Sequence, residues 1–135
     1  MVCYDGSDRS RNALNKTLDL FKDQNPDMMI LLVAEETLDA SMENEEVFEE
    51  WKKECHDLLN EVAKDVTQQG LEVDAILATG DPRTMIMEAI ENKAPDLVVM
   101  AKRGKGSVKN ALLGSVSTYV LRQAHCPVLV VKMPE

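Results

Sequence analysis

The chain has 135 residues, a length typical of one domain with a single core, and it carries a net charge of −9 at pH 7. This acidic balance argues against nucleic acid or an anionic membrane as the main partner. The three cysteines are an odd number at long intervals, so they do not indicate a disulfide framework.

No run of apolar residues approaches the ~18 needed for a helix that spans a bilayer. The first ten residues, MVCYDGSDRS, lack the charged and then apolar layout of a signal peptide. We therefore expect a soluble, cytoplasmic protein that forms one domain over residues 1–135.

The charge is unevenly distributed along the chain. Residues 1–96 hold nine Lys and Arg against 23 Asp and Glu, whereas residues 97–134 hold six basic residues and no acidic ones. A local anion site in an acidic protein would explain this distribution, and a solvated basic face without a ligand is the alternative.

The first third of the chain alternates strand and helix patterns. Val2–Tyr4 is a short apolar strand, and Asp5-Gly6-Ser7 is a turn. Apolar residues at helical spacing predict a helix over Asp8–Phe21. Met28–Ala34 is apolar at every position, which is typical of a strand covered on both faces of a parallel sheet.

The middle of the chain predicts one long helix and one strand. Ser41 can cap a helix with glutamates near its positive end, and Gly70 marks its C-terminal stop. Between them runs an amphipathic stripe that includes Trp51, Leu58 and Val62. Residues 71–79 follow as the third strand.

The last third repeats the alternation. Asp81-Pro82 is a helix start, and Ala94-Pro95 ends that helix. Residues 97–101 form an apolar strand, residues 115–124 a helix, and Val128–Val131 a final strand. Five strands separated by four helices predict a doubly wound α/β fold, with a five-stranded parallel sheet and helices on both faces.

Ligands bind such sheets at the carboxyl ends of the strands, where the strand order reverses. Met100 to Ser117, after the fourth strand, contains three glycines, four basic residues and no acidic one. It does not match a Walker A loop, because Gly104-Lys105 is followed by Gly106 and not by Ser or Thr. It does not match the dinucleotide fingerprint either, because Lys109 stands where the third glycine is required.

Gly114-Ser115 at a helix start still predicts an anion site, since the first N–H groups of a helix have no partners within it. Turn chemistry and helix capping alone are the alternative for these residues, as an Asx-turn is for Asp5. The adjacent pairs Cys55-His56 and His125-Cys126 lack the two-to-four-residue interval of zinc ligands, so no metal site is predicted from the protein alone.

The spacing of this segment resembles the universal stress protein family, whose motif is Gly, two residues, Gly, nine residues, then Gly-Ser or Gly-Thr. Here the pattern reads Ala101, two residues, Gly104, nine residues, Gly114-Ser115. The opening strand with its Asp-Gly-Ser turn and the closing YVLRQAHCPVLVVK are also similar to the family. The resemblance therefore covers the whole chain and implies a Rossmann-like sheet of the adenine nucleotide alpha hydrolase type.

The family's site can be carried over residue by residue. Cys3, Tyr4, Asp5 and Val33 would contact adenine and ribose, while Met100 and Ala101 would border the ribose and first phosphate. Ala101 departs from the motif glycine and is harmless if its φ is negative. The phosphates would be held by Gly104, Gly114, Ser115, Val116 and Ser117, with Arg103 as a nearby cation.

The resemblance implies a stress-response protein that binds ATP, with Mg²⁺, and acts as a nucleotide-dependent regulatory or interaction module. No catalytic residue is assigned, since the segment carries no general base, and at most slow hydrolysis is expected. A nucleotide-free dimeric interaction module and an adenine-nucleotide hydrolase or transferase remain the alternatives. The resemblance also implies a homodimer through Val128, Leu129, Val130 and Val131, because an exposed apolar sheet edge needs cover.

Overall fold

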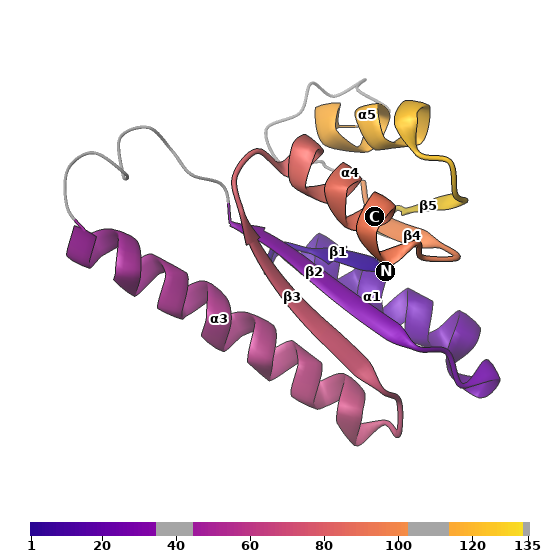
Figure 1. Cartoon of the computed structure of the whole chain (residues 1–135). Helices are drawn as coiled ribbons and strands as arrows, with labels where there is room; N and C mark the ends of the chain where they lie inside the picture. Colours follow the sequence, from indigo (N-terminus) through magenta and orange to yellow (C-terminus); the bar gives the residue numbers. More distant parts are fainter. Residues whose placement is uncertain (35–44, 103–113, 134–135) are drawn as a thin grey trace.

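The computed structural model describes residues 1–34, 45–102 and 114–133, and these form one five-stranded parallel sheet with helices on both faces (Figure 1). The strand order is β3-β2-β1-β4-β5, which confirms the predicted doubly wound α/β fold. In chain order the elements are β1 (Val2–Tyr4), α1 (Asp8–Phe21), the 3-10 turn η1 (Lys22–Gln24), β2 (Met28–Ala34), α3 (Glu45–Gln68), β3 (Val73–Thr79), α4 (Pro82–Lys93), β4 (Val98–Ala101), α5 (Ser115–Gln123) and β5 (Val128–Val131).

The predicted boundaries differ from the observed ones by one or two residues. The third strand begins at Val73 and not at residue 71, because Leu71 is buried against the core without joining the ladder. The fourth strand begins at Val98, and the last helix ends before Ala124, whose backbone is extended. The predicted cap at Ser41 lies outside the described residues.

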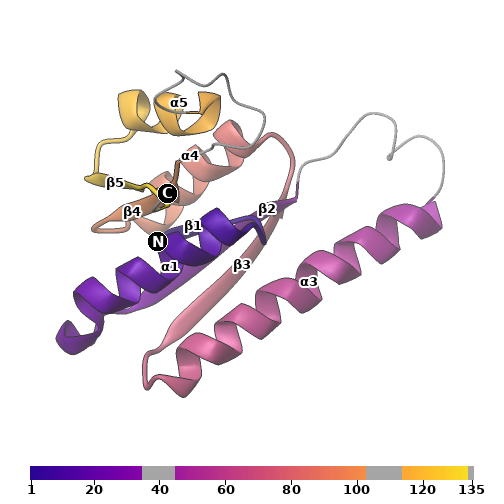
Figure 2. The same cartoon turned by 180° about the vertical axis from the view of Figure 1, so that it is seen from behind.

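Two apolar layers lie on opposite faces of the sheet. On one face, α1 and α3 bury Leu14 and Leu59 against β1 and β2, and on the other α4 and α5 bury Ile86 and Val120 against β2 and β4. Figure 2 shows α1 and α3 from the side that they cover. Because both faces are covered, the central strands are buried at almost every position, as their apolar runs predict.

The strand order reverses between β1 and β4, which lie side by side at the centre of the sheet. The chain leaves β1 toward α1 on one face, and α5 follows β4 on the other face. The carboxyl ends of these two strands therefore border a crevice of the kind in which doubly wound proteins bind ligands.

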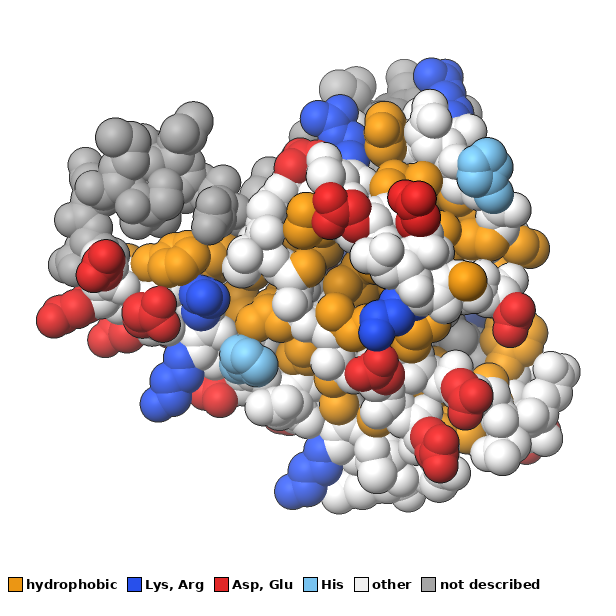
Figure 3. Space-filling model, in the orientation of Figure 1, with side chains coloured by type: hydrophobic (Ala, Val, Ile, Leu, Met, Phe, Trp, Pro, Cys, Tyr) orange, Lys and Arg blue, Asp and Glu red, His pale blue; other side chains and the backbone are white. Residues whose placement is uncertain are grey.

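The first part of α3 extends beyond the sheet (Figures 1 and 2), and its buried residues, Leu59, Val62 and Val66, all lie in the second half of the helix. Acidic side chains gather at its start, where Glu45 and Glu46 stand in the first turn (Figure 3). Of the helices described here, none has the length and apolar character that crossing a membrane requires.

Candidate functional site

A cleft of about 390 Å³ opens at the carboxyl ends of β1 and β4. Its floor is formed by the sheet, and its walls are formed by the first turns of α1, α4 and α5. The described residues that line it are Cys3, Tyr4, Asp5, Ser7, Arg9, Ser10, Leu31, Val33, Pro82, Ile86, Met100, Ala101, Lys102, Val116 and Ser117.

The cleft brings together most of the residues predicted from the sequence, although they come from four separate parts of the chain. Cys3, Tyr4, Asp5, Val33, Met100, Ala101, Val116 and Ser117 all line it. Gly114 and Ser115 stand at the start of α5 but do not line the cleft themselves. Arg103 and Gly104 lie outside the described residues, so their predicted role remains a prediction.

Several lining residues were not predicted, chiefly Ser7, Arg9 and Ser10 at the start of α1 and Pro82 at the start of α4. A signal for them was available. The Asp5-Gly6-Ser7 turn and the Asp81-Pro82 helix start both follow strands whose carboxyl ends share one edge of the sheet, so the helices that they begin must border the same crevice.

Asp5 belongs to the turn that leads from β1 into α1. Its Oδ1 accepts a hydrogen bond from Ser7 N at 2.9 Å, which is an Asx-turn. Ser7 Oγ then caps α1 by accepting from Ser10 N at 3.1 Å, and Ser10 Oγ donates to Ser7 O at 3.0 Å. The turn chemistry considered as an alternative for Asp5 is therefore present, and it holds this exposed carboxylate at the mouth of the cleft.

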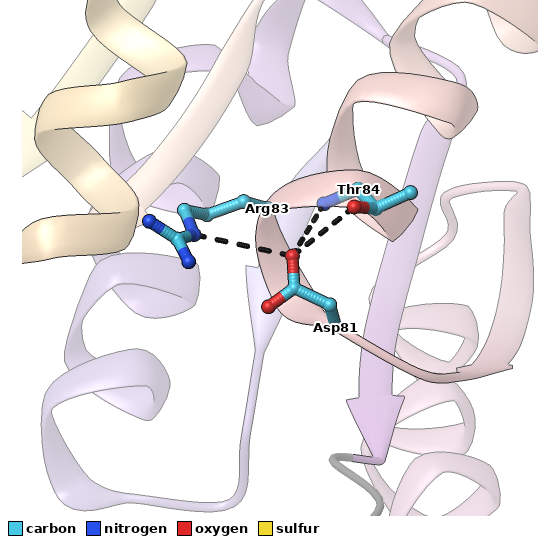
Figure 4. Close-up of polar contacts among 3 residues, drawn as sticks. All are labelled: Asp81, Arg83 and Thr84. Carbon is cyan, nitrogen blue, oxygen red and sulfur yellow. Dashed lines mark hydrogen bonds and ion pairs between the residues drawn. The ribbon is translucent and has the colours of Figure 1, made fainter.

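The start of α4 is capped in a similar way (Figure 4). Asp81 Oδ2 accepts hydrogen bonds from Thr84 N and Thr84 Oγ1, both at 3.1 Å, and lies 3.9 Å from Arg83 Nε. The Arg83 guanidinium lies 5.8 Å from the ring centroid of Tyr119, which joins the start of α4 to α5.

The start of α5 differs from those of α1 and α4, because none of the residues that the structure describes caps it with a side chain. Gly114 takes the N-cap position with φ −72° and ψ 164°, an extended conformation, and makes no side-chain hydrogen bond. Ser117 Oγ, on a residue that is 3% exposed, donates a long 3.5 Å bond to Ala101 O. The first N–H groups of a helix have no partners within it, so this turn of α5, which no described side chain caps, suits an anion.

Ala101 ends β4 with an ordinary negative φ, since the only described residues other than glycine with positive φ are Asn25 and Ala94. The backbone at this position does not need glycine. The condition under which we expected the substitution to be harmless is thus met.

The floor of the cleft is electrically neutral near neutral pH. Burial raises the pKa of the Cys3 thiol to about 12, so the thiol stays protonated. Burial also raises the pKa of the Tyr4 hydroxyl, against the opposing effect of Arg11.

The rest of the lining is partly apolar and partly basic. Leu31, Val33 and Met100 add apolar surface, while Arg9 and Lys102 contribute positive charge. Such a cleft suits a ligand with a flat, uncharged part and an anionic part.

A second hollow, of about 530 Å³, lies elsewhere, between the C-terminal part of α4 and the turn before β5. Its lining includes Met87, Glu91, Pro95 and His125, and none of the predicted site residues that the structure describes.

The fold and the cleft define a doubly wound α/β protein with a ligand crevice at its switch point. The sequence profile of the Universal stress protein family matches residues 1–132. Universal stress protein MJ0531 of Methanocaldococcus jannaschii is 34% identical over 139 aligned positions, which cover 100% of this chain and 82% of that protein. The chain belongs to the universal stress protein family.

Solved structures share this fold. The protein MJ0577 of Methanocaldococcus jannaschii superposes with a TM-score of 0.87 at 26% identity, over 99% of this chain and 94% of that one. A universal stress protein in complex with cAMP has a TM-score of 0.73 at 22% identity, covering 97% and 93% of the two chains. An Arabidopsis thaliana family member with AMP bound has a TM-score of 0.69 at 24% identity, covering 99% and 90%.

Proposed function

We propose that this chain binds ATP, with Mg²⁺, in the cleft between β1 and β4, and that it acts in the cytoplasm as a nucleotide-dependent regulatory or interaction module in the stress response. The observation that carries the proposal is the uncapped first turn of α5 beside an apolar, neutral floor. The N–H groups of this turn suit phosphates, and the floor suits adenine. The two solved relatives with cAMP and AMP support the choice of an adenine nucleotide.

The residues proposed to hold the base and ribose are Cys3, Tyr4, Asp5 and Val33, with Met100 and Ala101 beside the ribose. The proposed phosphate ligands are Gly104, Gly114, Ser115, Val116 and Ser117, together with Arg103. One helix N-terminus supplies only ~0.3–1 kcal/mol, whereas micromolar binding needs ~8 kcal/mol. Binding therefore requires the floor, the cations and the helix start to act together.

The direct test is to denature the purified protein and to analyse the released small molecules by chromatography. ATP titration should give a measurable heat and should raise the melting temperature of the nucleotide-free protein, because a ligand that binds only the folded state stabilises it. Absence of released adenine nucleotide together with no thermal shift at millimolar ATP would contradict the proposal and favour a nucleotide-free interaction module.

A phosphate-release assay on the same preparation distinguishes a binding protein from an efficient hydrolase or transferase. Asp5 is the one carboxylate among the described lining residues, and it is held in the turn before α1. We therefore expect phosphate release from excess ATP to be slow. Many turnovers per minute in a time-resolved phosphate assay would instead favour the enzyme.

We also propose that two copies pair through β5. β5 is the edge strand of the sheet, and Val128, Leu129 and Val130 are only half-buried. Val131 O accepts a hydrogen bond from Lys102 N at 2.8 Å and therefore faces β4. Because backbone groups of successive strand residues point to opposite sides, the N–H and C=O of Val130 face outward from the sheet edge.

Val130→Glu should shift the protein toward monomer in sedimentation velocity, whereas Val47→Glu, at an exposed position on α3, should not. A wild-type protein that is monomeric at high micromolar concentration would contradict this pairing.

A further inference from the structure

The second residue of α1, Arg9, is half-buried and lines the cleft. The helix start that carries it is well fixed, because Ser7 Oγ caps the helix and Ser10 Oγ returns a hydrogen bond to Ser7 O. Ser7 and Ser10 line the cleft as well, so the first turn of α1 as a whole forms one of its walls.

The charge of Arg9 is not neutralised by an ion pair with any described residue. The three ion pairs between described residues use Arg11, Arg83 and Lys93. Arg11, two positions further along α1, pairs with Asp65 of α3 at 2.8 Å and therefore joins two helices on the outer face of the sheet. α1 thus directs one arginine to a structural pair and places the other at the cleft.

Three other features of the cleft indicate which chemical group the Arg9 guanidinium could bind. Lys102 adds a second cation at the end of β4, and Asp5 is the one acidic residue among the described lining residues. The uncapped start of α5 stands across the crevice from α1, on the opposite face of the sheet. Residues near both helix starts line the same cleft, so an anionic group bound in it would have the first turns of α1 and α5 on either side.

We propose that Arg9 is a specificity-determining residue of the nucleotide site, which binds the phosphate part of the ligand from the α1 side and makes affinity depend on phosphate charge. This inference rests on the proposed function. A guanidinium stays charged at every accessible pH, and its planar fork of donors matches phosphate oxygens, which is why an arginine suits this role better than a lysine.

The experiment compares the affinities of ATP and adenosine in wild type, Arg9→Gln and Arg9→Lys. Titration calorimetry measures ATP directly, and displacement of bound ATP measures adenosine. Lys16→Gln is the matched control, because it removes the same charge from an exposed position on the same helix. Melting temperatures without ligand show whether each variant is folded.

Arg9→Gln should weaken ATP binding by about tenfold and leave adenosine binding within about twofold, because a charge-assisted hydrogen bond to phosphate is lost. Arg9→Lys should recover part of the ATP affinity, and Lys16→Gln should match wild type with both ligands. Equal losses for ATP and adenosine, or unchanged ATP affinity in Arg9→Gln, would overturn the proposal while the nucleotide-binding function stands. Failure of wild type to bind ATP would instead overturn the proposed function itself, and this inference with it.

Discussion

A Cβ atom built on Gly6 would lie 2.5 Å from Cδ2 of Leu58, although the two residues are 52 positions apart. The turn that carries Asp5 to the cleft is therefore packed directly against α3. Gly6 also has φ +84°, a conformation that side-chain-bearing residues rarely adopt. The glycine of the Asp-Gly-Ser turn thus avoids backbone strain at a positive φ and also leaves room for the terminal methyl of Leu58.

Gly6→Ala should lower the free energy of unfolding by about 1–2 kcal/mol, chiefly from the left-handed backbone and in smaller part from displacement of the Leu58 side-chain methyl. Gly70→Ala is the matched control, because Gly70 has φ +87° but no atom within 4 Å of an added Cβ. It should cost about 1 kcal/mol. Urea denaturation measures both variants.

The difference between the two glycine variants tests the contact with Leu58. If overlap causes the additional loss, Leu58→Ala should remove that part of the cost in a double-mutant cycle. Equal destabilisation by Gly6→Ala and Gly70→Ala would mean that the α3 contact imposes no cost on the turn.

Ala101→Gly should leave ATP affinity within about threefold of wild type. The backbone of Ala101 already has negative φ, so removing one methyl group from the cleft wall relieves no strain. Ala101→Val should weaken ATP binding by about tenfold, because it adds volume to the end of β4 where the ligand would lie. Calorimetric titration measures the affinities, and ligand-free melting temperatures control for folding. A large gain in ATP affinity in Ala101→Gly would show that the alanine obstructs the site.

The Cys3 thiol should resist alkylation in the folded protein. With a pKa of about 12, its thiolate fraction at pH 8 is about three orders of magnitude below that of an ordinary cysteine. Mass spectrometry of native and urea-unfolded protein after iodoacetamide treatment measures this, with Cys3 in urea as its own control. Rapid labelling of Cys3 in the native protein at pH 8 would contradict the expectation.

The Cys3 thiol should also make the free energy of unfolding decrease at high pH. The pKa of Cys3 is raised in the folded protein, so the unfolded chain releases its proton first, near pH 9. The contribution of the neutral Cys3 thiol to the free energy of unfolding is fully present below pH 9 and is lost between pH 9 and 12. The free energy of unfolding should fall by at most ~1.4 kcal/mol per pH unit in this range. The slope should be shallower in Cys3→Ala than in wild type when unfolding is measured at pH 8, 9 and 10. Parallel pH dependences in the two proteins would exclude Cys3 as a cause.

Asp81→Ala should destabilise the protein by about 1 kcal/mol, because it removes the side-chain oxygen that caps α4. Asp81→Asn should retain most of the stability, since asparagine is an equally good cap. Glu88→Ala, at an exposed position on the same helix, controls for loss of negative charge. Thermal or urea unfolding distinguishes them. A loss in Glu88→Ala as large as in Asp81→Ala would rule out capping as the cause.

Local patterns were sufficient for most of the secondary structure. The apolar run over Met28–Ala34 predicted a strand covered on both faces, and Asp81-Pro82 predicted the start of α4 to the residue. These predictions succeeded because caps, turns and burial on both faces are decided by neighbours in the chain. Strand ends were less accurate, as at Leu71, because core packing and ladder hydrogen bonds need not end at the same residue.

Strand and helix order in the chain predicted the fold class, the sheet edge that holds the cleft and the position of Asp5 at that edge, since the carboxyl ends of parallel strands share one edge. Ser117 was placed there by the family resemblance and not by the order of the elements. That Arg9 lines the cleft while Arg11 pairs with Asp65 follows from three-dimensional packing and not from the chain pattern. The direction in which two residues on one helix point depends on the angle at which that helix packs on the sheet. That angle is set by contacts with distant residues.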